Sequence, residues 1–159
     1  MNDADYMIEA VRAARLSPDT STQNGAVLVP RLGPPVAACN RPPERLPLIH
    51  ERAEPPLKYK FIEHAERAVI LQAARRGVCT DGATLYCPWY ACPECARAIL
   101  IAGIQEVVGL MALSVLTPPR WRDDVKLGVA MLREAGVRTR LLDRPLKERI
   151  VFDGHTLEV

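Results

Sequence analysis

Segments with helical and with extended periodicity alternate along most of the chain. Apolar residues recur three and four positions apart over residues 5–16 and 124–135, which predicts an amphipathic helix in each segment. Short runs rich in apolar residues and bounded by turn residues predict strands over residues 25–29, 36–39, 83–87 and 106–110. A further strand is predicted over residues 137–142, directly after Gly136, which closes the second helix. The first two strands are separated by a turn rich in proline and glycine, so we expect them to form a hairpin.

Two further helices are predicted in the middle of the chain. Residues 63–76 carry apolar side chains around much of the helical circumference, and Gly77 ends the segment. Pro93 fits the first turn of the other helix, which runs to residue 101 and ends before Gly103. This alternation predicts a single domain with helices on both faces of one sheet, a three-layer α/β/α sandwich.

Two segments have no clear periodicity. Residues 40–60 contain many prolines and charges, which predicts a long surface loop. Loops of this length in compact domains often serve function, and this one directly precedes His64, so we interpret it as a flap over a site. Residues 145–159 fit a short helix followed by an edge strand over 149–152.

A histidine, a glutamate and two cysteines carry the candidate chemistry. His64 and Glu66 stand at the start of the helix predicted over 63–76, and Cys92 and Cys95 at the start of the next. Helix N-termini favour thiolates, because their free N–H groups present partial positive charge. A structural zinc ion usually has four protein ligands, whereas a catalytic one keeps a position for water. Three ligands and a spare carboxylate therefore predict a catalytic zinc site.

Other interpretations of these motifs explain fewer of the residues. A redox function for the Cys-x-x-Cys pair leaves His64 and Glu66 without a role. A closed structural zinc site requires a fourth ligand, and the nearby candidate Cys87 falls in an apolar run typical of a buried strand. A zinc-stabilised interaction domain gives no function to Glu66. The order His-x-Glu and then Cys-x-x-Cys is that of zinc deaminases acting on nucleobases.

Composition restricts the class of substrate. The 159 residues include 21 basic and 19 acidic side chains, a net charge of +2, and only 5% are aromatic. This balance argues against a polynucleotide surface and favours a small charged substrate. The chain contains no apolar run that would span a membrane and no signal-peptide pattern, and its five cysteines are an odd set, so we expect a cytoplasmic protein.

The motifs resemble those of the cytidine and deoxycytidylate deaminase family, and most closely its deoxycytidylate (dCMP) branch. Residues 17–27 resemble the first motif of that branch, with Asn24 where valine is common. The motifs at His64 and Cys92 match the second and third, and residues 121–137 resemble the closing helix and strand. At Ala91 the chain departs from the usual proline.

The resemblance implies a mixed five-stranded sheet, one Zn²⁺ per chain and hydrolytic deamination of dCMP to dUMP and ammonia, with Glu66 as the proton shuttle. It also implies a homo-oligomer, a dimer or a hexamer, to which the apolar residues 100–101 and 107–113 would contribute. Deamination of a free nucleoside, of cytosine or guanine, or of a tRNA adenosine is the alternative within the same chemistry.

Candidate contacts to the base and sugar lie near the predicted strand ends. The resemblance implies that the backbone N–H of Ala65 binds the pyrimidine carbonyl. Asn24 and Asn40 flank two strands, where their amides would either meet a sugar hydroxyl or cap turns. Trp89 and Tyr90 precede Cys92 closely, where they would either stack on the base or pack into the core.

Candidate contacts to a phosphate lie in loops. Arg120 and Arg122 follow the fourth predicted strand and would bind a 5′-phosphate through paired hydrogen bonds, unless they are simply solvated. Further candidates of the same kind lie on the long loop, at Arg41, Arg45, His50 and Lys58.

Overall fold

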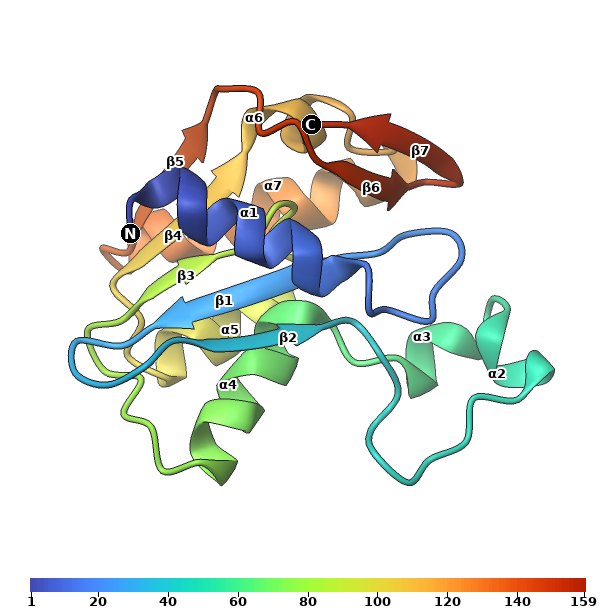
Figure 1. Ribbon diagram of the computed structural model, residues 1–159, viewed down its shortest axis with the longest axis horizontal. Helices are drawn as coiled ribbons and strands as arrows, with labels where there is room; N and C mark the ends of the chain where they lie inside the picture. Colours follow the sequence, from blue (N-terminus) through green and yellow to red (C-terminus); the bar gives the residue numbers. More distant parts are fainter.

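A mixed sheet of five strands forms the centre of the computed structural model, which describes residues 1–159 (Figure 1). Its strands are, in spatial order, β2 (Val36–Cys39), β1 (Gly25–Val29), β3 (Thr84–Tyr86), β4 (Glu106–Leu110) and β5 (Arg138–Leu142). β1 is antiparallel to both β2 and β3, whereas β3, β4 and β5 run parallel. The predicted hairpin and the predicted mixed five-stranded sheet are both confirmed.

Helices cover both faces of the sheet, as the three-layer prediction requires (Figure 1). One face packs against α4 (Ala65–Arg75), α5 (Pro93–Ile101) and α7 (Arg122–Glu134) around a buried core that includes Leu85 and Val107. The other face packs against α1 (Asp3–Ala14), which begins with a capping box between Asn2 and Asp5. α1 lies close to β1, where a Cβ on Gly25 would be 2.0 Å from the Ala10 carbonyl oxygen.

The irregular segments contain elements that the periodicity did not predict. The long loop over 40–60 includes two short helices, α2 (His50–Ala53) and α3 (Lys58–Phe61). A further short helix, α6 (Met111–Val115), and the 3₁₀ turn η1 (Pro119–Trp121) connect β4 to α7. Helices of three to five residues are too short to show a hydrophobic period, and so composition alone marked these segments as loops.

Near the C-terminus, the predicted strand over residues 149–152 is confirmed, whereas the short helix predicted before it is wrong, because residues 145–148 form no helix. β6 (Arg149–Phe152) pairs with β7 (His155–Glu158) in a separate antiparallel hairpin instead of extending the central sheet. Ile150 and Phe152 are buried and join the core formed with α1. The hairpin therefore packs beside α1 and adds to that layer (Figure 1).

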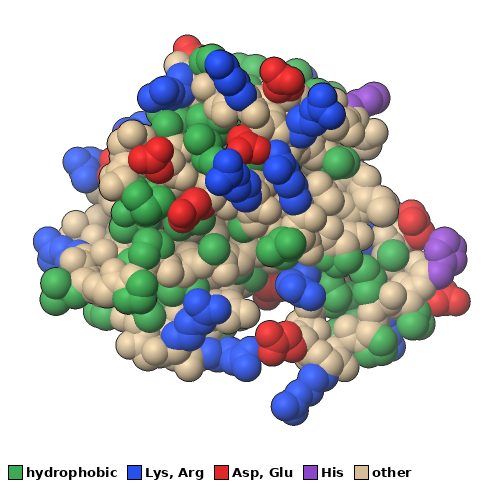
Figure 2. All heavy atoms as spheres, viewed as in Figure 1, with side chains coloured by type: hydrophobic (Ala, Val, Ile, Leu, Met, Phe, Trp, Pro, Cys, Tyr) green, Lys and Arg blue, Asp and Glu red, His purple; other side chains and the backbone are tan.

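The surface differs from one expectation about association. Residues 107–110 lie in the buried strand β4 and Leu113 is also buried, so within 107–113 only Met111 and Ala112 reach the surface, whereas Ile101 is 87% exposed. Acidic and basic side chains are interspersed on the face shown in Figure 2.

None of the helices has the length and hydrophobicity needed to cross a lipid bilayer.

Candidate active site

Three metal-binding side chains meet where α4 and α5 begin. His64 is the N-cap residue of α4 and Cys92 that of α5, while Cys95 lies in the first turn of α5. Nδ1 of His64 is 3.5 Å from Sγ of Cys92 and 3.5 Å from Sγ of Cys95. The two helices thus place three ligand atoms within 4.8 Å of one another, although the residues are far apart in sequence.

These distances fit a tetrahedral zinc ion. Zn–N bonds of about 2.0 Å and Zn–S bonds of about 2.3 Å at the tetrahedral angle place nitrogen and sulfur about 3.5 Å apart. No fourth side chain joins the group. Cys87 is fully buried and its thiol donates to the Trp89 carbonyl oxygen at 3.2 Å, and burial raises the pKa of this thiol well above its ordinary value. The group therefore offers three ligand atoms, and a tetrahedral ion held by them would keep one position for another molecule.

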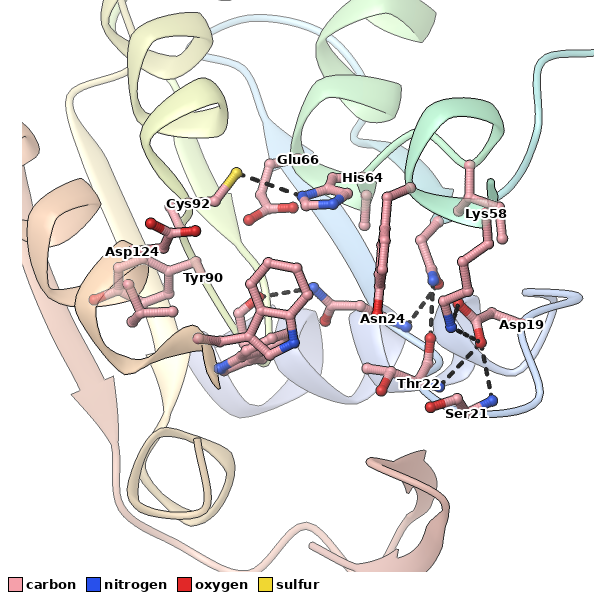
Figure 3. Close-up of a pocket in the computed structure, with 18 of the residues that line it drawn as sticks. Asp19, Ser21, Thr22, Asn24, Lys58, His64, Glu66, Tyr90, Cys92 and Asp124 are labelled. Atoms are coloured by element: carbon pink, nitrogen blue, oxygen red, sulfur yellow. Dashed lines mark hydrogen bonds and ion pairs between the residues drawn. The ribbon is translucent and has the colours of Figure 1, made fainter. Parts of the chain in front are cut away.

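Glu66 lies beside these ligands and is not needed as one of them. It occupies the first turn of α4, and its carboxylate approaches the His64 ring and Cys92 (Figure 3). Only 3% of the residue is exposed, and no cation pairs with the carboxylate. Burial raises the pKa of Glu66, against the opposing charge of His64. A carboxyl group in such surroundings is suited to exchanging protons.

Glu63 and Arg67 form hydrogen bonds with the metal-binding residues His64 and Cys95. Oε1 of Glu63 accepts hydrogen bonds from the backbone N–H of His64 at 3.0 Å and from Nε of Arg67 at 2.6 Å. Nη1 of Arg67 lies 3.7 Å from Sγ of Cys95, to which it donates. Outer contacts of this kind orient metal ligands and stabilise thiolate charge.

A cavity extends from the metal-binding group to a second, charged end (Figure 3). At that outer end, Nζ of Lys58 pairs with Asp19, which also accepts hydrogen bonds from the backbone N–H groups of Ser21 and Thr22. Arg120 also lines this cavity and is paired with Asp153 in the turn between β6 and β7. The outer end thus offers two cations, each next to a carboxylate.

Most of the predicted substrate contacts line this cavity. They are Asn24, Asn40, Ala65, Trp89, Tyr90 and Arg120. Arg122 does not line it, because its side chain turns away and Nε donates to the Thr117 carbonyl oxygen at 3.2 Å. Lys58, a secondary candidate, does line it.

Several lining residues were not predicted from the sequence. They are Asp19, Ser21, Thr22, Tyr59, Ile62, Trp121, Asp124 and Val125. For Asp19 the sequence did contain a clue to a role at the site, because the residue belongs to the first motif. Its position after a predicted helix, however, suggested only a turn. Asp124 lies in the first turn of α7. Acidic residues are common at this position because they interact favourably with the positive end of the helix dipole, so Asp124 did not indicate a binding site.

Two aromatic side chains are held in the cavity wall by contacts outside the cavity. Nε1 of Trp89 donates to Oγ1 of Thr117 at 3.0 Å, and its ring meets that of Phe152 edge to face at 5.1 Å. The Tyr90 ring packs against Gly109, where a Cβ would come within 2.3 Å of it. The wall is therefore rigid on this side.

Comparison with known proteins agrees with this architecture. A three-ligand zinc site at two helix N-termini beside a mixed sheet defines a zinc-binding α/β protein. The chain belongs to the cytidine and deoxycytidylate deaminase family, because the family model of the zinc-binding region matches residues 1–111. Family membership confirms the predicted zinc cofactor.

Individual relatives extend the comparison. Deoxycytidylate deaminase of Enterobacteria phage T2 is 39% identical over 74 residues, which are 46% of this chain and 35% of that protein. The chain thus spans about a third of the length of the curated relatives that it matches. The dCMP deaminase of cyanophage S-TIM5 has the same fold, with a TM-score of 0.70 and 20% identity over 88% of this chain and 96% of that one.

Proposed function

We propose that this protein hydrolyses dCMP to dUMP and ammonia. The observation that carries the proposal is the buried Glu66 carboxylate beside a three-ligand zinc site, at the inner end of a cavity whose outer end holds Lys58 and Arg120. The likeness to phage T2 deoxycytidylate deaminase supports this substrate. So does the solved cyanophage dCMP deaminase in complex with dCMP and dUMP, which shares the fold at a TM-score of 0.69.

Each of the residues at the inner end of the cavity has a separate role in the proposed reaction. A zinc ion held by His64, Cys92 and Cys95 supplies a Lewis acid that makes water a stronger nucleophile. When water adds to C4 of cytosine, Glu66 would accept one proton from the water and pass it to ring N3. Glu66 then carries the second proton to the amine, which leaves as ammonia. The backbone N–H of Ala65 would hold the pyrimidine carbonyl during these transfers.

The charged outer end of the cavity supports a nucleoside monophosphate as the substrate. Lys58 and Arg120 are positioned to bind a 5′-phosphate, and the carboxylates of Asp19 and Asp153 hold the two cations in place. A free base would leave these charges unused. A polynucleotide would need a wider basic surface than the interspersed charges of Figure 2 provide on that face.

The direct test is a comparison of substrates with the zinc-loaded protein. Ammonia release and the ultraviolet spectrum would be followed with dCMP, dCTP, deoxycytidine, cytosine, guanine and an anticodon-loop RNA. We expect dCMP to be used best. Glu66→Gln should keep its zinc and lose turnover, since the amide cannot shuttle a proton. Turnover only of the RNA or of a free base would contradict the proposal, and an inert, zinc-loaded wild type would favour an interaction domain.

We also propose that the chain forms a homo-oligomer. Large apolar side chains remain exposed on neighbouring helices, with Ile101 of α5 at 87% and Leu71 of α4 at 56%. Sedimentation velocity of the wild type and of Ile101→Asp would test this, and a wild-type monomer at micromolar concentration would contradict it.

A further inference from the structure

Asp124 is a carboxylate on the cavity wall that has no cationic partner in the protein. It lies in the first turn of α7, is exposed and lines the cavity. It forms no ion pair. The other two carboxylates that line the cavity already have roles, because Asp19 pairs with Lys58 and Glu66 serves the proton transfers. Asp124 is therefore the carboxylate of the cavity that still lacks a function.

The dipole of α7 does not explain why this carboxylate lies in the cavity. Asp123 also stands in the first turn of α7, where it interacts with the helix dipole in the same way, and it does not line the cavity. A second carboxylate inside the cavity would repel an anionic nucleotide unless it met a hydrogen-bond donor of that nucleotide. The position of Asp124 thus indicates a contact with the ligand.

The residues before and after Asp124 show which end of the cavity it faces. Arg120, four positions earlier, lies at the outer end. Gly128, four positions later and so on the same side of α7, lies against the metal-binding turn, where a Cβ would be 3.0 Å from the backbone carbonyl carbon of Cys92. Figure 3 shows the Asp124 carboxylate at the end of the cavity that holds Cys92, away from Asp19. Asp124 therefore lies toward the inner end, where the reacting edge of the base would bind.

The chemistry of this edge limits what Asp124 would meet. The hydrogen-bond donor that cytosine carries at C4 is its amino group, with two N–H bonds. Deamination replaces this group by a carbonyl oxygen, which only accepts hydrogen bonds. An ionised carboxylate is also only an acceptor, so it attracts the amino group of the substrate and repels the carbonyl oxygen of the product.

We propose that the carboxylate of Asp124 accepts a hydrogen bond from the 4-amino group of cytosine and thereby makes the protein bind dCMP more tightly than dUMP. The inference rests on the proposed dCMP activity and adds a specificity-determining residue to it. A site built to pair with an amino group rejects the analogue that lacks it, because its own polar group is then left unpaired. The same contact would help the product to leave.

The test measures equilibrium binding to zinc-loaded protein in which turnover is blocked by Glu66→Gln. Calorimetry gives Kd for dCMP and for dUMP. With Asp124 present, dCMP should bind about 10- to 100-fold more tightly than dUMP, as expected for a hydrogen bond to a charged group. Adding Asp124→Asn should bring the two Kd values close together, because the amide can donate to the carbonyl oxygen as well as accept from the amino group.

Asp123→Asn is the matched control. It removes the same charge from the same turn of α7 outside the cavity, so it should leave the ratio of the two Kd values unchanged. A ratio near one with Asp124 present, an unchanged ratio in Asp124→Asn, or an equal change in both variants would overturn the inference, while dCMP turnover by the wild type would still support the proposed function. A wild type without dCMP turnover would overturn both.

Discussion

Nζ of Lys58 lies 3.0 Å from Oδ2 of Asp19, and the two side chains are only 10% and 7% exposed. Asp19 in turn binds two backbone N–H groups of the segment that leads into β1. The pair thus joins α3 to the wall of the cavity, so its electrostatics and the shape of the outer end depend on each other.

Breaking this pair on one side should destabilise the protein. Lys58→Met leaves the Asp19 carboxylate buried without a cation, and we expect the free energy of unfolding to fall by about 3 kcal/mol. The double variant Asp19→Asn with Lys58→Met should be more stable than Lys58→Met alone, because no uncompensated charge remains. Urea unfolding followed by circular dichroism measures both.

An exposed ion pair provides the control. Arg75 and Glu44 are 66% and 62% exposed, so Arg75→Met should change the free energy of unfolding by less than about 1 kcal/mol. If Lys58→Met were as mild as Arg75→Met, the buried pair would have no structural importance.

Arg120 in η1 and Arg122 at the start of α7 should differ in their effect on catalysis. Arg120 lines the cavity and Arg122 does not. Arg120→Ala should raise KM for dCMP about 10- to 100-fold by removing a charge-assisted hydrogen bond to phosphate, and leave KM for deoxycytidine unchanged. Arg122→Ala should leave both values near those of the wild type. Steady-state kinetics with both substrates checks this, and equal effects of the two variants would argue against phosphate binding by Arg120.

Gly128 should tolerate no side chain despite its place in a helix. It lies in α7, where alanine would favour the helix by about 1 kcal/mol. A Cβ at this position, however, would lie 2.0 Å from the Ala91 carbonyl oxygen, on the turn that carries Cys92. Gly128→Ala should therefore lower both the melting temperature and the zinc affinity, measured by calorimetry and chelator competition. A rise in melting temperature would show that α7 can move away from this turn.

Acid should remove one link between α1 and the sheet. Oδ2 of Asp3 pairs with Nη1 of Arg140 at 2.6 Å, and Oδ1 accepts from the Tyr86 hydroxyl at 2.7 Å. The hydrogen bond from Arg140, followed by that from Tyr86, lowers the pKa of Asp3 below 3.8.

A lowered pKa gives stability that is present above pH 3.8 and is lost as the pH falls through the lower, folded-state pKa. Asp3→Asn should therefore be less stable than the wild type at neutral pH, and the difference should shrink as the pH falls below 3.8. Unfolding free energies across this range test the sign. A difference that grows in acid would contradict it.

The sequence was informative where the relevant signals are local. His64, Cys92 and Cys95 were found because ligand spacing and helix starts lie within a few residues. The strands β1 and β4 were found because each has a buried run rich in apolar residues. The pairing partner of β6 was not predictable in this way. The sequence indicated a strand over residues 149–152, but whether this strand joins the central sheet or β7 depends on how it packs against α1.

The outer end of the cavity also depends on contacts between residues far apart in the sequence, which local patterns do not reveal. Lys58 pairs with a residue 39 positions away and Arg120 with one 33 positions away. Which charged loop residues approach the cavity depends on how the intervening chain folds, and for this reason the sequence could not distinguish Arg120 from Arg122. Nor could it distinguish Asp124, which lines the cavity, from its neighbour Asp123, since this depends on how α7 packs.

The position of the metal ligands has a consequence for chain entropy. Because His64 and Cys92 are 28 residues apart, a zinc ion that binds both closes a loop containing all of α4 and β3. By the chain-entropy relation that applies to disulfides, a cross-link of this length restricts the unfolded ensemble by about 3–4 kcal/mol. The ion would thus act as a reversible cross-link between the N-termini of α4 and α5. An unfolded chain that still held the ion would recover its full conformational entropy only after the ion dissociated.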